Sequence, residues 1–91
     1  MRVRFAFAYP GNPSSASTEY PGTFVRTVDL PFDRTPALGE AISFGGRFVT
    51  KVVQVLWRLD GEIEINLKVH AGLKSRPPSR AQLVADGWSE L

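Results

Sequence analysis

Residues 41–69 read AISFGGRFVTKVVQVLWRLDGEIEINLKV, a run that two turn signals divide into three consecutive β-strands. The second signal is Asp60-Gly61. A two-residue loop there would mix polar and apolar side chains on both faces of the hairpin. A three-residue loop over 59–61, with Gly61 as the left-handed residue of a G1 bulge, gives one apolar face instead. The predicted register therefore pairs Trp57 with Ile63, Val55 with Ile65 and Val53 with Leu67, and Gln54 with Asn66 on the other face.

The first turn signal is Gly45-Gly46, because paired glycines supply the positive φ values of a two-residue hairpin loop. Such a loop pairs Phe44 with Arg47 and Ile42 with Val49. The strand that follows, within residues 47–60, is longer than the usual length of about 5 to 6 residues. We therefore expect a bend or bulge in it, as in the coiled strand shared by the two parts of a small half-barrel.

The N-terminal third predicts two more strands. Residues 1–9 and 23–30 alternate apolar and polar side chains, which is the pattern of half-buried strands. Between them, residues 10–22 are rich in Gly, Pro and Ser and are predicted to form a mobile loop. In the connector before the first hairpin, Phe32 and Leu38 are expected to plug one end of a barrel.

The C-terminal part predicts a linker and one short helix. Residues 71–79 form a basic linker that two prolines stiffen. Ser79 and Gln82 match a capping box, and Gly87 is placed to follow the helix C-terminus. A helix over 79–87 has only about two turns and is marginal alone. It should therefore be held by the packing of Leu83, Val84 and Trp88.

These elements predict a single domain over residues 1–91 of the all-β, β-dominated class. The expected architecture is a small five-stranded, partly open barrel, SH3-like or OB-like, with one short C-terminal helix. A domain of this length buries roughly 60 to 65% of its unfolded surface, which is enough for one core.

Composition narrows the function classes. The chain has no cysteine, which excludes a disulfide framework, a thiolate metal site and a cysteine nucleophile. It has no nucleophile elbow and no Gly-rich phosphate loop, so we expect a protein that is not an enzyme and uses no cofactor. It shows no signal peptide and no membrane span, and the expected localisation is cytoplasmic.

The remaining ionisable candidates have ordinary structural interpretations. His70 is the single histidine, and a metal site there would need carboxylate partners, so a strand-end or surface histidine is expected. Asp29, Asp33 and Glu40 flank the connector and would converge at one barrel end, where carboxylates can bind a divalent cation. Their spacing does not match an EF-hand loop, and turn-forming roles are favoured. The sequence predicts no metal site but leaves open whether these three form a site.

Basic residues give the strongest hint of a binding surface. The candidate contacts for nucleic acid or a partner are Lys68, Lys74, Arg76 and Arg80, which surround a stretch without acidic residues. The strands add Arg26, Arg47, Lys51 and Arg58. The sequence pI of about 9.4 suits a nucleic-acid face. The net charge is only +2, however, and most aromatic residues lie at core-facing positions. Nucleic-acid binding is therefore the alternative hypothesis, and a steep salt dependence would reveal it.

One stretch of the sequence reads LPFDRTPALGEAISFGGRFVTKVVQVLW and is followed by DGEIEINL. It resembles a recurring type of small bacterial and phage β-barrel. There, a proline-rich lead precedes a hairpin, a valine-rich strand and a final strand. SH3-like modules, adaptor proteins and phage connector parts share this pattern, which carries over no functional residue. The leading hypothesis is a non-enzymatic interaction module that binds another protein or a second copy. A homodimer through a free sheet edge is the simplest assembly.

Overall fold

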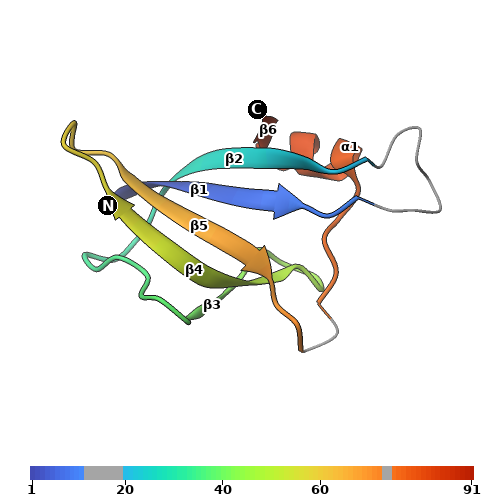
Figure 1. Cartoon of the computed structure of the whole chain (residues 1–91), viewed down its shortest axis with the longest axis horizontal. Helices are drawn as coiled ribbons and strands as arrows, with labels where there is room; N and C mark the ends of the chain where they lie inside the picture. The colour runs from blue at the N-terminus through green and yellow to red at the C-terminus, as the bar shows by residue number, and fades with distance from the viewer. Residues whose placement is uncertain (12–19, 73–74) are drawn as a thin grey trace.

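The computed structural model describes residues 1–11, 20–72 and 75–91. Within these residues, six strands form one sheet in the order β3-β4-β5-β1-β2-β6. The elements are β1 (Arg2–Tyr9), β2 (Gly22–Asp29), β3 (Ala41–Ser43), β4 (Val49–Trp57), β5 (Ile63–Val69), α1 (Arg80–Ala85) and β6 (Ser89–Glu90). Figure 1 shows β2, β1, β5 and β4 side by side, with α1 and β6 next to β2.

The sheet is mixed and buries one of its faces. Its pairs are antiparallel except β1 with β5, which run parallel. Along β1 every second side chain is buried, which places Val3, Phe5, Phe7 and Tyr9 in the core. The C-terminal segment covers this face with Leu83 and Trp88. Burial of these large apolar side chains is the main favourable contribution to stability.

The predicted β4–β5 register is confirmed at its turn end. Trp57 lies opposite Ile63, Val55 lies opposite Ile65, and Gly61 has a φ of 89°. The predicted Val53–Leu67 pair is wrong, because a bulge between Val52 and Gln54 makes Val52 the partner of Leu67. A bulge inserts one residue into the strand, so the side-chain alternation changes there and Val53 points to solvent. The expected bulge in this long strand is thus present.

The apolar face predicted for this hairpin would place Trp57 in the core, and the structure does not bury it there. Trp57 is paired as predicted, but 66% of it is exposed. It is the last residue of β4, and its neighbours Leu56 and Leu59 are exposed as well. Correct pairing fixes the face on which a side chain lies, whereas burial also requires another element to cover that face.

The first hairpin differs from its predicted register by one residue. Ile42 lies opposite Thr50 and Ser43 opposite Val49, so the predicted Ile42–Val49 and Phe44–Arg47 pairs are wrong. The Phe44 N–H donates to the Phe48 carbonyl, 2.9 Å away, which leaves three residues in the loop instead of two. The physical reason is burial: this register turns Phe48 and Thr50 into the core, where each is at most 5% exposed.

The short C-terminal helix is confirmed. At its start, the Gln82 N–H donates a hydrogen bond to the Ser79 side chain at 3.2 Å. At its end, the Trp88 N–H donates to the Leu83 carbonyl at 3.0 Å. Leu83 and Trp88 are buried as predicted, but Val84 is exposed because it lies on the outer side of the helix. The chain then forms β6, a strand that the sequence did not predict.

The all-β class is confirmed, and the expected number of five strands is wrong by this one addition. The sheet is not closed in the described part of the chain, because β3 and β6 form its edges. The predicted mobile loop at 10–22 falls mainly on residues 12–19, outside the described residues. Among the residues described, no helix combines the length and apolar character needed to cross a membrane.

Candidate functional site

The unclosed sheet has a gap between β3 and the second half of β2. β6 pairs with β2 only at Phe24 and Val25. Within the described residues, the stretch of β2 from Arg26 to Asp29 therefore has no strand on its outer edge, and β3 has none on its own outer side. Side chains from both strands line one pocket. The candidate site is thus a direct consequence of incomplete closure.

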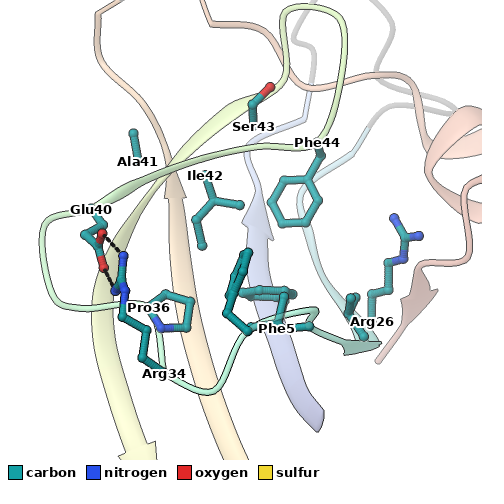
Figure 2. A pocket seen from close by; sticks show the side chains of 12 residues that line it. Phe5, Arg26, Arg34, Pro36, Glu40, Ala41, Ile42, Ser43 and Phe44 are labelled. Atoms are coloured by element: carbon teal, nitrogen blue, oxygen red, sulfur yellow. Dashed lines mark hydrogen bonds and ion pairs between the residues drawn. The ribbon is translucent and has the colours of Figure 1, made fainter. Parts of the chain in front are cut away.

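This pocket, which we call the gap pocket, has a volume of about 530 Å³. Its apolar lining comes from β1, β2, β3 and the connector between β2 and β3, and includes Phe5, Val28, Leu30, Phe32, Ile42 and Phe44. Figure 2 shows Ile42 of β3 and Phe44, the residue after β3, extending toward Phe5. The rings of Phe5 and Phe44 meet edge to face with centroids 5.4 Å apart. Both size and lining are typical of a binding site.

Phe32 lines this pocket and does not fill the end of a barrel. The prediction that Phe32 and Leu38 fill a barrel end is wrong, because they are 54% and 69% exposed. The sheet formed by the described residues is not closed, so the connector has no barrel end to fill there. An exposed Phe32 at the rim instead adds apolar surface that a ligand can cover.

Arg26 occupies a core-facing position at one end of the gap pocket. Side chains alternate along β2, so Arg26 shares a face with the buried Phe24 and the half-buried Val28. Its partner on β1 is Phe5, which is also buried. No ion pair or hydrogen bond joins its guanidinium to any residue that the structure describes. A partly buried cation without a counter-charge is costly, and such a group marks a place for an anion.

The other charged pair of the pocket is neutralised within the chain. Arg34 donates to both Glu40 carboxylate oxygens, at 2.7 and 2.8 Å, as the dashed lines in Figure 2 show. These hydrogen bonds from Arg34, together with one from the Ala37 N–H, lower the pKa of Glu40 to about 2. Arg34 and Glu40 therefore brace the connector that forms the pocket rim.

The stabilisation that Glu40 gives to the connector between β2 and β3 should be lost in acid. Because the pKa of Glu40 is about 2 in the folded protein and 4.5 ordinarily, ionised Glu40 stabilises the fold above pH 4.5. That contribution should disappear as the pH falls from 4.5 to 2. The stability difference between wild type and Glu40→Gln, measured by urea denaturation at several pH values, should shrink over this range. A difference that is constant from pH 6 to about 2 would contradict the bracing role.

The free edge of β3 presents backbone groups beside the pocket. The Glu40 carbonyl accepts from the Val52 N–H at 2.9 Å, and the Phe44 N–H donates to Phe48. In an antiparallel ladder, hydrogen-bonded positions alternate with positions whose groups point away. Ala41 and Ser43 therefore direct their N–H and carbonyl groups away from β4, toward the gap. These groups can pair with an added strand.

Three of the four basic residues that the sequence singled out lie within the described part of the chain. Lys68 lies exposed on the outer face of β5, where it is paired opposite Lys51. Arg76 lies exposed in the segment before α1, and its backbone N–H donates to the Arg47 carbonyl at 2.8 Å. Lys74 lies outside the described residues. Lys68, Arg76 and Arg80 thus belong to three different parts of the described chain: β5, the segment before α1, and the start of α1.

Arg80 has a structural role in the chain. Its guanidinium pairs with Glu90 of β6 at 2.5 Å, lies 3.6 Å from the Tyr20 ring centre and donates to the Tyr20 carbonyl. Its side chain is only 11% exposed, and the hydrogen bond with Glu90 raises the pKa of Arg80. Arg80 thus ties the start of α1 to β6 and to the residues before β2.

The acidic candidates and the histidine are also separate. Asp29 lies 3.2 Å from the Met1 amino group, Asp33 is exposed, and Glu40 is bound to Arg34. His70 lies just after β5, where its Nδ1 accepts a hydrogen bond from the Gly72 N–H at 3.0 Å. Among the described residues, no group of three or more acidic, histidine or cysteine side chains could hold a metal ion.

Arg26 is the site residue whose significance sequence reasoning missed. By composition alone, Arg26 is one of several basic residues in the predicted strands. Its position carried a signal, since Phe24, Val28 and Leu30 have the same parity in the predicted strand and are all apolar. A single arginine within such an apolar series indicates either a buried ion pair or a ligand contact.

Comparisons of the chain with protein-family models, with curated proteins and with solved structures found no match.

Proposed function

We propose that this protein is a non-enzymatic interaction module that binds an extended segment of another protein. The segment pairs with the free edge of β3 and places alternate side chains in the gap pocket. The observation that carries the proposal is the presence of an unpaired strand edge directly beside an apolar pocket. In strand addition, main-chain hydrogen bonds supply affinity and pockets for alternate side chains supply specificity.

The topology supports an extended ligand in particular. Ala41 and Ser43 present donors and acceptors at strand spacing, while Ile42 between them contributes its side chain to the pocket. A strand added here would lie between β3 and the free part of β2. It would bring the sheet closer to a barrel of the SH3-like or OB-like type, and it would cover Phe32 and Phe44.

Selection from a display library of random linear peptides tests this function. Recovered peptides should share apolar residues at alternate positions, because only every second side chain of a strand faces the pocket. Added to the ¹⁵N-labelled protein, a recovered peptide should shift the amide signals of Arg26, Val28, Ala41 and Ser43. Signals of the outer-face residues Asn66 and Lys68 serve as the control and should move little.

Two results would contradict the proposal. One is recovery of no peptide above the background of an unrelated protein. The other is a set of peptides whose signal changes lie on the outer face of β4 and β5. If the recovered peptides match a stretch of this chain itself, sedimentation equilibrium will show whether the partner is a second copy.

A second candidate function is nucleic-acid binding, which one observation favours. Lys51 and Lys68 lie directly opposite each other on β4 and β5, and both are exposed. Like charges at paired positions destabilise a sheet unless an anion lies between them. No salt bridge to either lysine is present among the described residues. A phosphate backbone along the outer face would relieve this repulsion, with the steep salt dependence expected of phosphate contacts.

A further inference from the structure

The gap pocket carries one uncompensated positive charge. Two arginines, Arg26 and Arg34, and one acidic residue, Glu40, line it. Glu40 is held in two hydrogen bonds by Arg34, so that pair is satisfied within the chain. The positive charge therefore belongs to Arg26. A ligand that fills the pocket should bring a negative charge to that position and nowhere else.

The position of this charge along the pocket can be read from its neighbours. Arg26 lies against Gly87, because a Cβ atom built on that glycine would be 3.5 Å from Arg26 Nε. Phe44 lies against Trp88, the residue after Gly87, with ring centroids 5.3 Å apart. Arg26 and Phe44 therefore lie at the same end, next to the segment that follows α1. Figure 2 shows them on one side of the pocket, with Arg34 and Glu40 on the other.

The rest of the pocket is apolar between these two ends. Ile42 of β3 precedes Phe44 by two residues, and Val28 follows Arg26 by two residues on β2. In a ligand strand between them, side chains on the same face are about 6.5 to 7 Å apart along the strand. Of two ligand side chains that face the pocket and are two residues apart, one would thus contact Arg26 and the other would contact the apolar section. Their order depends on the direction in which the ligand strand runs.

We infer that the gap pocket binds extended segments in which an acidic residue and a bulky apolar residue are separated by one position. This inference rests on the proposed function and names the class of segment. The carboxylate of the aspartate or glutamate pairs with Arg26, and the apolar side chain contacts Val28, Ile42 and Phe32. Arginine suits this role because its planar guanidinium binds a carboxylate through two parallel hydrogen bonds.

The pair should be stronger than an ordinary surface ion pair. Arg26 lies on the core-facing side of β2 and is partly buried, so water screens it less than it screens the exposed lysines. An added strand would bury the guanidinium further. The apolar surroundings also penalise a neutral or basic residue there, since it would leave the Arg26 charge buried without a partner.

The test uses a recovered peptide and its counterpart in which the acidic residue is replaced by the matching amide. Wild-type protein should bind the acidic peptide about 10 to 100 times more tightly than the amide peptide, as judged by isothermal titration calorimetry. Arg26→Gln should remove this preference, and it should keep or raise the affinity for the amide peptide, because no buried charge is then left without a partner. Arg26→Lys should restore part of it. Lys51→Gln removes the same charge from the outer face and should keep the full preference.

The outcomes separate this inference from the proposed function. Recovered peptides without enrichment of acidic residues, or an acidic preference that survives in Arg26→Gln, would overturn the inference while strand binding stands. An equal loss of preference in Lys51→Gln would also overturn it, because long-range attraction would then account for the effect. Failure to recover any peptide would overturn both.

Discussion

Replacing Trp88 with alanine is expected to lower the free energy of unfolding by about 3 to 5 kcal/mol. Trp88 is 2% exposed, and its ring meets those of Phe7, Phe44 and Phe48 with centroids 5.3 to 6.2 Å apart. The substitution would leave a large cavity between the sheet and the C-terminal segment. A domain of this size has about 5 to 15 kcal/mol of stability in total. Urea denaturation followed by far-ultraviolet circular dichroism measures the change.

The second tryptophan provides a matched control. Trp57→Ala removes the same side chain, but 66% of Trp57 is exposed, so its cost should be less than about 1 kcal/mol. Circular dichroism is preferable to fluorescence because each variant loses one of the two fluorophores. If the two variants were equally destabilised, the end of β4 would be packed and the described position of Trp57 would be wrong.

Ser43→Pro is expected to weaken binding of a selected peptide by about tenfold or more, with the fold retained. The Ser43 N–H points toward the gap and not toward β4, so its loss removes a hydrogen bond to the added strand only. Proline is tolerated on edge strands at such positions. Calorimetric titration measures the affinity, and thermal melting checks the fold.

Ser43→Ala is the control for this substitution. It removes the hydroxyl, which accepts only a long hydrogen bond of 3.4 Å from the Gly45 N–H, but it keeps the backbone donor. Its affinity for the peptide should stay close to that of wild type. If Ser43→Ala weakened binding as much as Ser43→Pro, the hydroxyl would be the contact, and strand addition at β3 would lose its support.

Periodicity and turn chemistry predicted most of the fold. The Asp60-Gly61 turn and its three-residue loop followed from the requirement for one apolar face, as did the pairing of Trp57 with Ile63. The position of the bulge did not follow, because either Val52 or Val53 can face the core in a run of apolar residues. The glycine pair at the first turn fitted two loop lengths, and burial of Phe48 and Thr50 decided between them.

The candidate site was less accessible to sequence reasoning. The gap pocket exists because β6 is too short to cover the outer edge of β2, and a two-residue strand has no detectable period. Composition and spacing drew attention to Arg80, whose charge is paired with Glu90 within the chain. They did not draw attention to Arg26, because the lack of a partner among the described residues is visible only once its surroundings are known.

Amide hydrogen exchange at Ala41 and Ser43, with and without a selected peptide, tests strand addition most directly. In the free protein both amides should exchange rapidly, since they point away from β4 and lie on the free edge. In the complex both should be protected, while the exposed turn amide of Leu59 should exchange as before. Unchanged exchange at Ala41 and Ser43 when the peptide is bound would contradict strand addition to β3.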